Sequence, residues 1–470
     1  MKKSFKLFTF VGLFLVVWIQ LFSTFIPIYN LVFPFTFDQA RDAIWVKNQF
    51  DFQQPTLIGP WGSLSGVFFG PGWFWLLGIP YFIFGGDPAS YVFLNAVIIF
   101  GTVFMAAMLI YKHNLKISYF IIILGFLSQA ISGIAGYAFS QHLLLPLTLT
   151  TVFSYAKFLN NHKIRYFTLA VFSISLMFHA EPATAFFSLP SIAAIILSVR
   201  SKKTIFNIKN ALFILCAFLI PLVPQIIFDF KHDFIELRAV INFFCWANHS
   251  LGDILPFWSR LIDRPLKFFE VFKLTSVNHP LLAFIVMSLA CYYSLFRLKN
   301  YFEKDLVRSS YIYLITLLLG FLVFPPDLKG FYLDGLAIVY ILMLSVVLGN
   351  LWNNGSIGKI IVSVFIALTV TLNIDRTKLL NIINSDYGNS LKNGSVFRNL
   401  ARQVDWIYND ARGNGFAVYT YDPAIYDFPF QYMFLWYGLK TYGYLPNEFS
   451  YLPNVPEYVQ KKRYVYSKNK

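Results

Sequence analysis

The chain carries a series of apolar runs of about 17 to 23 residues, nearly free of charge, and this feature limits most strongly how it can fold. A helix of roughly 20 apolar residues is long enough to cross the roughly 30 Å hydrocarbon core of a bilayer. We therefore predict an all-α membrane protein with about eleven transmembrane helices. The predicted spans are residues 6–26, 90–110, 117–137, 140–158, 164–179, 182–199, 208–228, 279–298, 309–325, 331–350 and 357–373.

The composition agrees with a membrane protein and argues against a soluble one. Of the 470 residues, 57% are hydrophobic and only 13% are charged, whereas charged residues make up roughly a quarter of soluble domains. The net charge of +15 comes from Lys and Arg in short clusters between the apolar runs, not from one continuous basic surface. Such clusters are typical of topology signals, so we do not expect nucleic acid as a partner.

The N-terminus resembles a secretory signal peptide, with Lys2, Lys3 and Lys6 followed by an apolar stretch to about Phe25. No small-residue cleavage site precedes Ile28. We therefore predict that this segment is retained as the first membrane span.

Residues 66–84 form a further apolar run, which contains six Gly and Pro residues. Both residue types break helices, and at membrane depth they are tolerated only where protein or a cavity covers the freed backbone groups. If this run were a full span, the basic residues from Lys112 to Arg165 would lie outside the cell. We therefore predict a membrane-dipping segment of the first outer loop.

Basic residues between the spans set the predicted orientation, because cytoplasmic loops are enriched in Lys and Arg. With the N-terminus inside and residues 66–84 not counted as a span, every second loop is basic. Only two acidic residues, Glu303 and Asp305, offset the positive charge of these loops. The expected location is the plasma membrane, with the C-terminal tail outside. The inner-loop basic residues are Lys112, Lys116, Lys157, Lys163, Arg165, Arg200, Lys202, Lys203, Lys209, Arg297, Lys299, Lys304, Arg308 and Lys359.

This orientation puts three long segments on the outer face: a first loop at 27–89, a second at about 229–278, and the tail. Long loops on one face of a bundle usually build a functional site. We expect a transmembrane domain at 1–373 and a small extracytoplasmic α/β domain at 374–470. In the tail, the patterns predict helices at 397–411 and 426–437 and strands at 415–421 and 463–466.

The most distinctive polar motif follows the first span. Thr36 and Gln39 have the spacing of a capping box, which predicts a helix that begins here. Asp38, Arg41 and Asp42 then share one face at positions i, i+3 and i+4. The opposite side is apolar, so we expect the helix to lie along the membrane surface. The arginine suits bidentate contact with a phosphate, whereas a simple surface ion pair is the alternative.

Other polar residues lie at the outer ends of predicted spans. His142 opens one span, and His179 with Glu181 occupies the next outer turn. Ionisable groups at such positions are costly and often mark a functional path. A structural hydrogen bond between helices explains His179 and Glu181 equally well, and metal binding is less expected because the i, i+2 spacing is poor for two ligands on one helix.

Two further outer turns contain cations. Lys231 and His232 end one span, and Lys329 is the single cation of another turn, followed by Tyr332. A lysine on the outer face runs against the topological bias. It is expected either to contact a phosphate or to reach toward lipid headgroups.

Motifs of soluble enzymes are missing from the sequence. There is no P-loop, no Gly-x-Gly-x-x-Gly after a strand, no Gly-x-Ser-x-Gly elbow and no His-Glu-x-x-His. The three cysteines have neither zinc nor disulfide-framework spacing. Chemistry driven by a bound nucleotide is therefore not expected.

The basic first span, the motif from Asp38 to Asp42, and the Gly70 to Trp75 and Gly85 to Pro88 segments together resemble glycosyltransferase family 39, the dolichyl-phosphate-mannose-protein mannosyltransferase-like family. This family shares the GT-C fold with the aminoarabinose transferase of lipid A. The resemblance extends over essentially the whole chain and is most specific in the first outer loop.

The resemblance implies a membrane glycosyltransferase. Such an enzyme transfers a sugar, with inversion, from a polyprenyl-phosphate carrier to a lipid, glycan or protein acceptor. Asp38 would orient or deprotonate the acceptor, while Arg41 and Lys329 would hold the donor phosphate. Asp42, His142, His179, Glu181, Lys231, His232 and Tyr332 are the supporting polar candidates. The resemblance implies no metal ligand and leaves open whether a divalent metal assists.

The sequence departs from the family at two places. Protein mannosyltransferases tend to carry Asp-Glu where this chain has Asp38-Gln39, and lipid A transferases carry Lys near the position of Gly70. The sugar and the acceptor therefore stay open.

A transporter or flippase of lipid-linked sugars is the alternative function. Transporters place ionisable residues near the middle of their spans and often have repeated halves. Here the ionisable residues gather at one face, which favours the enzyme. A scaffold without catalysis explains the spans but not the outward Asp38, Arg41 and Lys329.

Overall fold

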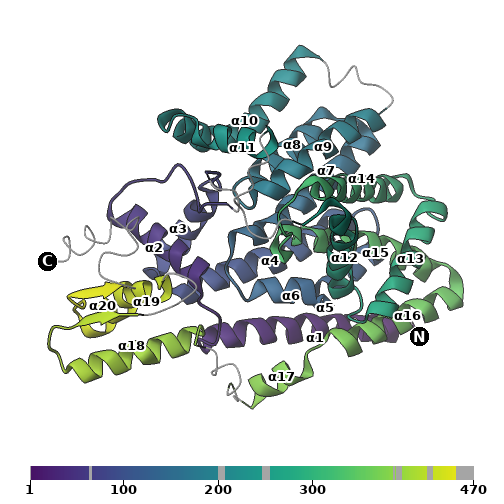
Figure 1. Ribbon diagram of the computed structural model, residues 1–470. Coiled ribbons are helices and arrows are strands. Elements are labelled where there is room, and N and C mark those ends of the chain that lie inside the picture. Colours follow the sequence, from purple (N-terminus) through teal and green to yellow (C-terminus); the bar gives the residue numbers. More distant parts are fainter. Residues whose placement is uncertain are drawn as a thin grey trace. The chain divides into compact units, whose positions relative to one another are not determined.

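The computed structural model describes residues 2–62, 66–199, 207–245, 255–384, 387, 394–420 and 427–450, and these are mostly helical (Figure 1). The chain forms two compact units. The first contains Met1–Thr24, Thr56–Trp73 and Asn95–Thr377, and the second contains Phe25–Pro55, Phe74–Leu94 and Lys378–Lys470. Four helices have residues in both units: α1 (Lys2–Tyr29), α3 (Gly72–Phe84), α4 (Pro88–Tyr111) and α17 (Arg376–Ile383).

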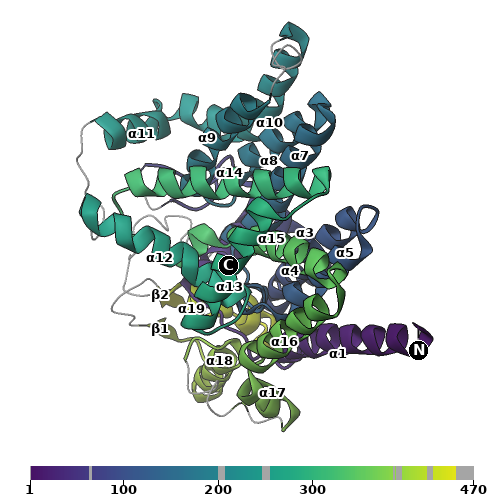
Figure 2. The same ribbon diagram turned by 90° about the vertical axis from the view of Figure 1, so that its right-hand side faces the viewer.

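The first unit is a helical bundle in which α14 lies against α7 and α9, and α8 packs between α7 and α10 (Figures 1 and 2). Two 3-10 turns precede helices of this bundle. Its elements are α5 (Leu115–Leu127), α6 (Gln129–Ala135), η1 (Ser140–Leu143), α7 (Leu144–Asn161), α8 (Ile164–Met177), α9 (Pro182–Ser198), α10 (Ile208–Lys231), α11 (Ile235–Cys245), α12 (Phe257–Thr275), α13 (Pro280–Phe296), α14 (Tyr301–Val323), η2 (Gly330–Leu333), α15 (Leu336–Asn353) and α16 (Gly355–Asn373).

Asparagine caps fix the starts of three long helices of this unit. The Asn114 side chain accepts from the backbone N–H of Lys116, that of Asn300 from Phe302, and that of Asn207 from Lys209. These bonds satisfy backbone donors that the first helical turn leaves unpaired. Helices α5, α14 and α10 therefore begin in polar turns, each within a basic loop of the sequence.

The second unit contains α2 (Phe37–Asp51) and the tail elements. Those are α18 (Phe397–Ala411), β1 (Ala417–Tyr419), α19 (Phe428–Tyr432), the π-helix η4 (Met433–Gly438), α20 (Leu439–Tyr442) and β2 (Glu448–Ser450). Strands β1 and β2 pair in parallel, with Ala417 opposite Glu448. The helix predicted at 397–411 is confirmed. The helix predicted from 426 begins at Phe428, and the strand predicted at 463–466 lies outside the described residues.

Every predicted span contains helix, which confirms the all-α membrane fold. Within the described residues, six helices are long and apolar enough to cross a bilayer, or up to eight when each bent helix pair counts as one span. Helices α3, α8 and α9 are shorter apolar helices. The predicted second outer loop is largely helical in its described part, because it contains α11 and all of α12.

The two bent pairs share one polar clasp. Helices α5 and α6 meet at 59°, and α12 and α13 meet at 94°. The side-chain amide of Asn373 donates to the carbonyls of Leu127 and Ser276, one at each bend, both at 3.1 Å. Asn278 donates to the side chain of Gln129 at 2.7 Å. The carbonyl groups of Leu127 and Ser276, one at each bend, therefore both accept hydrogen bonds from the side chain of Asn373.

The glycines before α3 lie against a buried histidine. The backbone N–H of Gly72 donates to His179 Nδ1 at 2.9 Å, and His179 Nε2 contacts the carbonyl of Pro221 at 2.9 Å. A Cβ added to Gly70 would lie 2.3 Å from His179 Nδ1. Positions 70 and 72 therefore need glycine for close packing at the start of α3.

This packing predicts the effect of Gly70→Ala. The added methyl group overlaps the imidazole, and overpacking of this kind costs roughly 1–3 kcal/mol. We expect a melting temperature several degrees below that of the wild type in detergent. Gly101→Ala is the control, because a Cβ there meets nothing within 4 Å. Equal melting temperatures for the two variants would contradict this account of the packing.

Candidate functional site

Three groups of polar side chains contain most of the residues that the sequence singled out. Two lie in the first unit and one in the second. We call them the η1–η2 cluster (Asn95, Gln141, His142, Glu181, Tyr332 and Asp334), the α12 cation cluster (Arg260, Asp263, Arg264, Lys267, Asp327 and Lys329) and the α2 triad (Asp38, Arg41 and Asp42).

The η1–η2 cluster gathers side chains from the ends of several apolar helices. His142 Nδ1 lies 3.3 Å from Asn95 Oδ1, and its Nε2 lies 3.6 Å from Asp334 Oδ2. The second distance is within the range of an ion pair but too long for a good hydrogen bond. His142 is buried, and Asp334 Oδ2 is a buried oxygen without a hydrogen-bond partner in the described part of the chain.

Glu181 connects η1 to the start of α9. Its carboxylate accepts from Gln141 Nε2 at 3.2 Å and from the backbone N–H of Ala183 at 3.3 Å, so it caps α9. The carbonyl of Tyr332 accepts from Thr184 on the same helix at 2.8 Å. Burial raises the pKa of Glu181 to about 8. The structure thus joins three predicted candidates, His142, Glu181 and Tyr332, with Asn95 and Asp334, which the sequence analysis did not select.

His179, Lys231 and His232 lie outside these clusters. Both ring nitrogens of His179 have partners, as described above, and this side chain holds the start of α3. His232 stacks on Phe228 with ring centroids 4.0 Å apart, next to the turn in which Asp229 caps α11. Lys231 is exposed at the end of α10. In the described part of the chain, no group of three or more His, Cys, Asp or Glu side chains is placed to hold a metal ion.

The α12 cation cluster surrounds Lys329, so this lysine is not an isolated cation. Its Nζ lies 2.7 Å from Asp327 Oδ2, and Lys267 Nζ lies 2.5 Å from Asp327 Oδ1. The two lysines lower the pKa of Asp327 to about 2. Arg260 and Arg264 add two positive charges and Asp263 one negative charge. Four cations and two carboxylates leave a net charge of +2.

Arg264 holds this cluster in place. Its side chain is fully buried, and it donates to the carbonyls of Phe321, Phe324 and Pro326. Phe321 lies in the last turn of α14, where carbonyls lack intrahelical partners, and Phe324 and Pro326 follow the helix directly. The sequence contained a signal for this face, because Arg260, Arg264 and Lys267 follow the i, i+4, i+7 spacing of one helix side.

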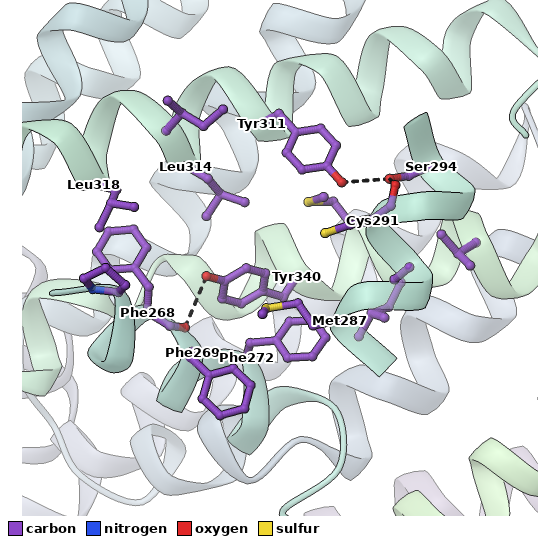
Figure 3. A pocket seen from close by; sticks show the side chains of 16 residues that line it. Phe268, Phe269, Phe272, Met287, Cys291, Ser294, Tyr311, Leu314, Leu318 and Tyr340 are labelled. Carbon is purple, nitrogen blue, oxygen red and sulfur yellow. Dashed lines mark hydrogen bonds between the residues drawn. The ribbon is translucent and has the colours of Figure 1, made fainter. Parts of the chain in front are cut away.

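An apolar cavity of about 240 Å³ lies on another side of the same helix (Figure 3). Phe268, Phe269 and Phe272 of α12 line it, together with residues of α13, α14 and α15. Tyr340 donates to the carbonyl of Phe268, and Ser294 bonds Tyr311, so these hydroxyl groups are already satisfied. The cavity can therefore hold a hydrocarbon chain without leaving a polar group unpaired.

The α2 triad is a buried ion network. Arg41 Nη1 lies 2.8 Å from Asp38, and its Nη2 lies 2.8 Å from Asp42. The side chains of Arg41 and Asp42 are almost fully buried, whereas that of Asp38 keeps 35% exposure. Gln39 Oε1 accepts from the backbone N–H of Thr36 at 3.1 Å, which is the predicted capping contact of the glutamine. Asp38 is thus the accessible member of the triad.

The expected position of α2 along the membrane surface is corrected. Ala40 and Ala43 are fully buried, and Ile44 is nearly so. Helix α2 packs against α19, where the rings of Phe37 and Phe428 lie 4.9 Å apart. The apolar side of α2 is therefore covered by protein, because the tail supplies a helix that buries it.

The comparisons place this architecture among known structures. No protein-family model and no curated protein matches the chain. The crystal structure of ArnT from Cupriavidus metallidurans in the apo state matches 95% of this chain and 89% of its own, with 12% identity and a TM-score of 0.56. The chain has an ArnT-like GT-C fold. The structure of the same protein bound to undecaprenyl phosphate matches 88% of this chain and 72% of its own, with 12% identity and a TM-score of 0.51.

The fold implied by the sequence resemblance is thereby confirmed. This ArnT-like chain is a multi-pass membrane protein, since its apolar helices and its fold agree. At 12% identity the likeness concerns the fold alone.

The raised pKa of Glu181 predicts a pH-dependent stability. A carboxyl whose pKa rises from 4.5 to about 8 on folding stabilises the protein fully below pH 4.5. This stabilisation is lost as the pH rises toward 8, by up to about 1.4 kcal/mol per pH unit. We expect the wild-type melting temperature to fall between pH 5 and 8, and Glu181→Gln to have a shallower slope.

Asp327→Asn is the matched control for this slope. The pKa of Asp327 lies at about 2, so this group stays ionised in both folded and unfolded states between pH 5 and 8. The control should keep the wild-type slope. A Glu181→Gln slope equal to that of the wild type would show that Glu181 does not titrate in this range.

Proposed function

We propose that the chain is a glycosyltransferase that takes a sugar from a polyprenyl-phosphate carrier and transfers it, with inversion, to a lipid, glycan or protein acceptor outside the plasma membrane. The observation that carries this proposal is the arrangement on α12. A cation cluster and an apolar cavity lie on one helix, next to each other along the chain at Lys267 and Phe268. A phosphate joined to a long hydrocarbon chain matches both.

The donor phosphate is assigned to Lys329 and Lys267. Their cluster has a net positive charge and includes the half-exposed Lys329, whose side chain keeps 58% exposure. The α2 triad has two carboxylates for one guanidinium, so an approaching phosphate meets net negative charge there. A phosphate contact of Arg41 stays a prediction from the resemblance, but the electrostatics favour the lysines.

Asp38 is assigned as the catalytic base. A half-exposed carboxylate can accept the proton of an acceptor hydroxyl while the oxygen of that hydroxyl attacks the anomeric carbon. The bond from that carbon to the phosphate oxygen breaks, and the phosphate leaves with the electron pair, stabilised by lysine. Arg41 is a positioning residue in this scheme, because it fixes the carboxylate of Asp38 at 2.8 Å.

The ionisable candidates lie at helix ends, which supports an enzyme over a transporter. Glu181 caps α9, Lys329 precedes η2, and His142 lies in η1. A transporter would be expected to carry such groups within its spans. Orientation with these ends outside rests on the basic residues of the opposite loops.

Replacement of Asp38 tests the catalytic step. Asp38→Asn should lower sugar transfer from a polyprenyl-phosphate sugar on the order of 10²- to 10⁴-fold, because general base catalysis contributes about this much. Asp51→Asn, at the other end of α2, should retain activity. Transfer is measured in sealed right-side-out vesicles with the acceptor outside. Activity that requires permeabilised vesicles would refute the orientation, and movement of the intact lipid-linked sugar without transfer would indicate a flippase.

Replacement of the lysines tests the phosphate site. Lys267→Gln and Lys329→Gln should each raise the KM for the donor roughly tenfold, since a hydrogen bond to a charged group contributes about 1.5 kcal/mol or more. Lys273→Gln is the control on the same helix, where Lys273 pairs with Glu270. An unchanged KM for the donor in both Lys267→Gln and Lys329→Gln would refute the assignment of the donor phosphate to this cluster.

A further inference from the structure

A second cavity in the first unit has a different character from the one in Figure 3. It measures about 170 Å³ and lies among the segment before α3, the start of α9, and helices α10 and α11. Among its lining residues are the polar Glu181, Gln225 and Glu236, together with Val240.

Three of these side chains bring oxygen acceptors to the cavity. Glu181 is almost fully buried, and Glu236 accepts from the backbone N–H of Phe68 at 2.9 Å. Gln225 is 7% exposed, and its Nε2 donates to the carbonyl of Phe68 at 3.1 Å. Its Oε1 is buried and has no hydrogen-bond partner in the described part of the chain. A buried acceptor of this kind is costly unless a ligand or water satisfies it.

The rest of the described lining is apolar and mostly aromatic. Six phenylalanines surround the acceptors, and none of the described lining residues is Lys, Arg or His. Burial raises the pKa of Glu181 to about 8 and that of Glu236 to about 7, so both carboxyls titrate near neutral pH. An anionic ligand would meet these acids without a compensating charge.

The size of the cavity suits a single ring. An engineered protein cavity of roughly 150 Å³ holds one benzene molecule, and this cavity is similar at about 170 Å³. Phenyl rings can cover the apolar face of a sugar ring, while carboxyl and amide oxygens accept from its hydroxyl or amine groups.

We propose that this cavity binds one sugar ring that presents hydroxyl or amine donors and bears no acidic group. The inference rests on the proposed function, because it names the sugar class that such a transferase would use. Uronic acids and phosphorylated sugars are excluded because the described lining offers no cation to pair with a buried anion. Glu236 and Gln225 accept from the ring substituents, and the phenylalanines contact its faces.

The test is direct binding of methyl glycosides to the purified full-length chain in a detergent without a sugar headgroup. Saturation-transfer NMR compares methyl glucoside, methyl glucosaminide and methyl glucuronide. We expect binding of the first two, and at least about tenfold weaker binding of the glucuronide, which is about 1.4 kcal/mol. Equal binding of the glucuronide, or no binding of any glycoside, would overturn the proposal.

Two variants test whether the glycosides bind in this cavity. Val240→Trp fills the space and should abolish binding. Glu236→Gln keeps a side-chain oxygen that can accept from the backbone N–H of Phe68, and it should weaken glycoside binding several-fold. This variant tests the cavity even if Val240→Trp does not fold. Glu270→Gln, an exposed carboxylate on α12, is the control and should bind like the wild type. Wild-type binding in a folded Val240→Trp variant or in Glu236→Gln would place the sugar elsewhere.

The readout separates this inference from the proposed function. Binding needs neither donor lipid nor turnover. If the wild type transfers a sugar but these variants bind glycosides normally, the cavity assignment fails and the transferase stands. If the variants lose binding while Asp38→Asn leaves transfer unchanged, the cavity assignment stands and the catalytic assignment fails.

Discussion

One buried guanidinium fixes the geometry on which the donor assignment depends. Arg264 donates to the carbonyl of Phe321 in the last turn of α14 and to those of Phe324 and Pro326 just after it. Its side chain is fully buried, so these bonds satisfy backbone groups away from bulk water. The turn from Pro325 to Lys329 is thereby held against α12. Asp327, which pairs with both Lys267 and Lys329, lies in this turn, so the backbone contacts of Arg264 and the ion pairs of Asp327 together place the two lysines.

The sequence predicted the fold better than the site. Apolar runs gave the helices, because length and apolar character directly report a bilayer. The start of α2 and the helix at 397–411 were also correct, since capping and helical spacing are local signals. The position of α2 was not predicted, because the helix that buries it, α19, comes almost 400 residues later. Local patterns carry no information about such a partner.

For the site, the sequence found positions at helix ends but not their partners. His142 and Glu181 were selected because ionisable groups are rare beside apolar runs, whereas Asp334 and Gln225 needed the tertiary structure. Lys267 was overlooked because α12 was read as part of a loop, although its basic spacing was present. His179 shows the reverse case, since its conspicuous position reflects packing against Gly70 and Gly72.

The clasp at Asn373 links two parts of the bundle that are far apart in the chain. One side-chain amide bridges the bend after α5 and the bend after α12. The angle between α12 and α13 helps to define the apolar cavity, because both helices line it. Asn373, Gln129 and Asn278 are not among the residues that line this cavity. The outline of an apolar space therefore depends in part on a polar contact made outside it, and the two bends share that contact.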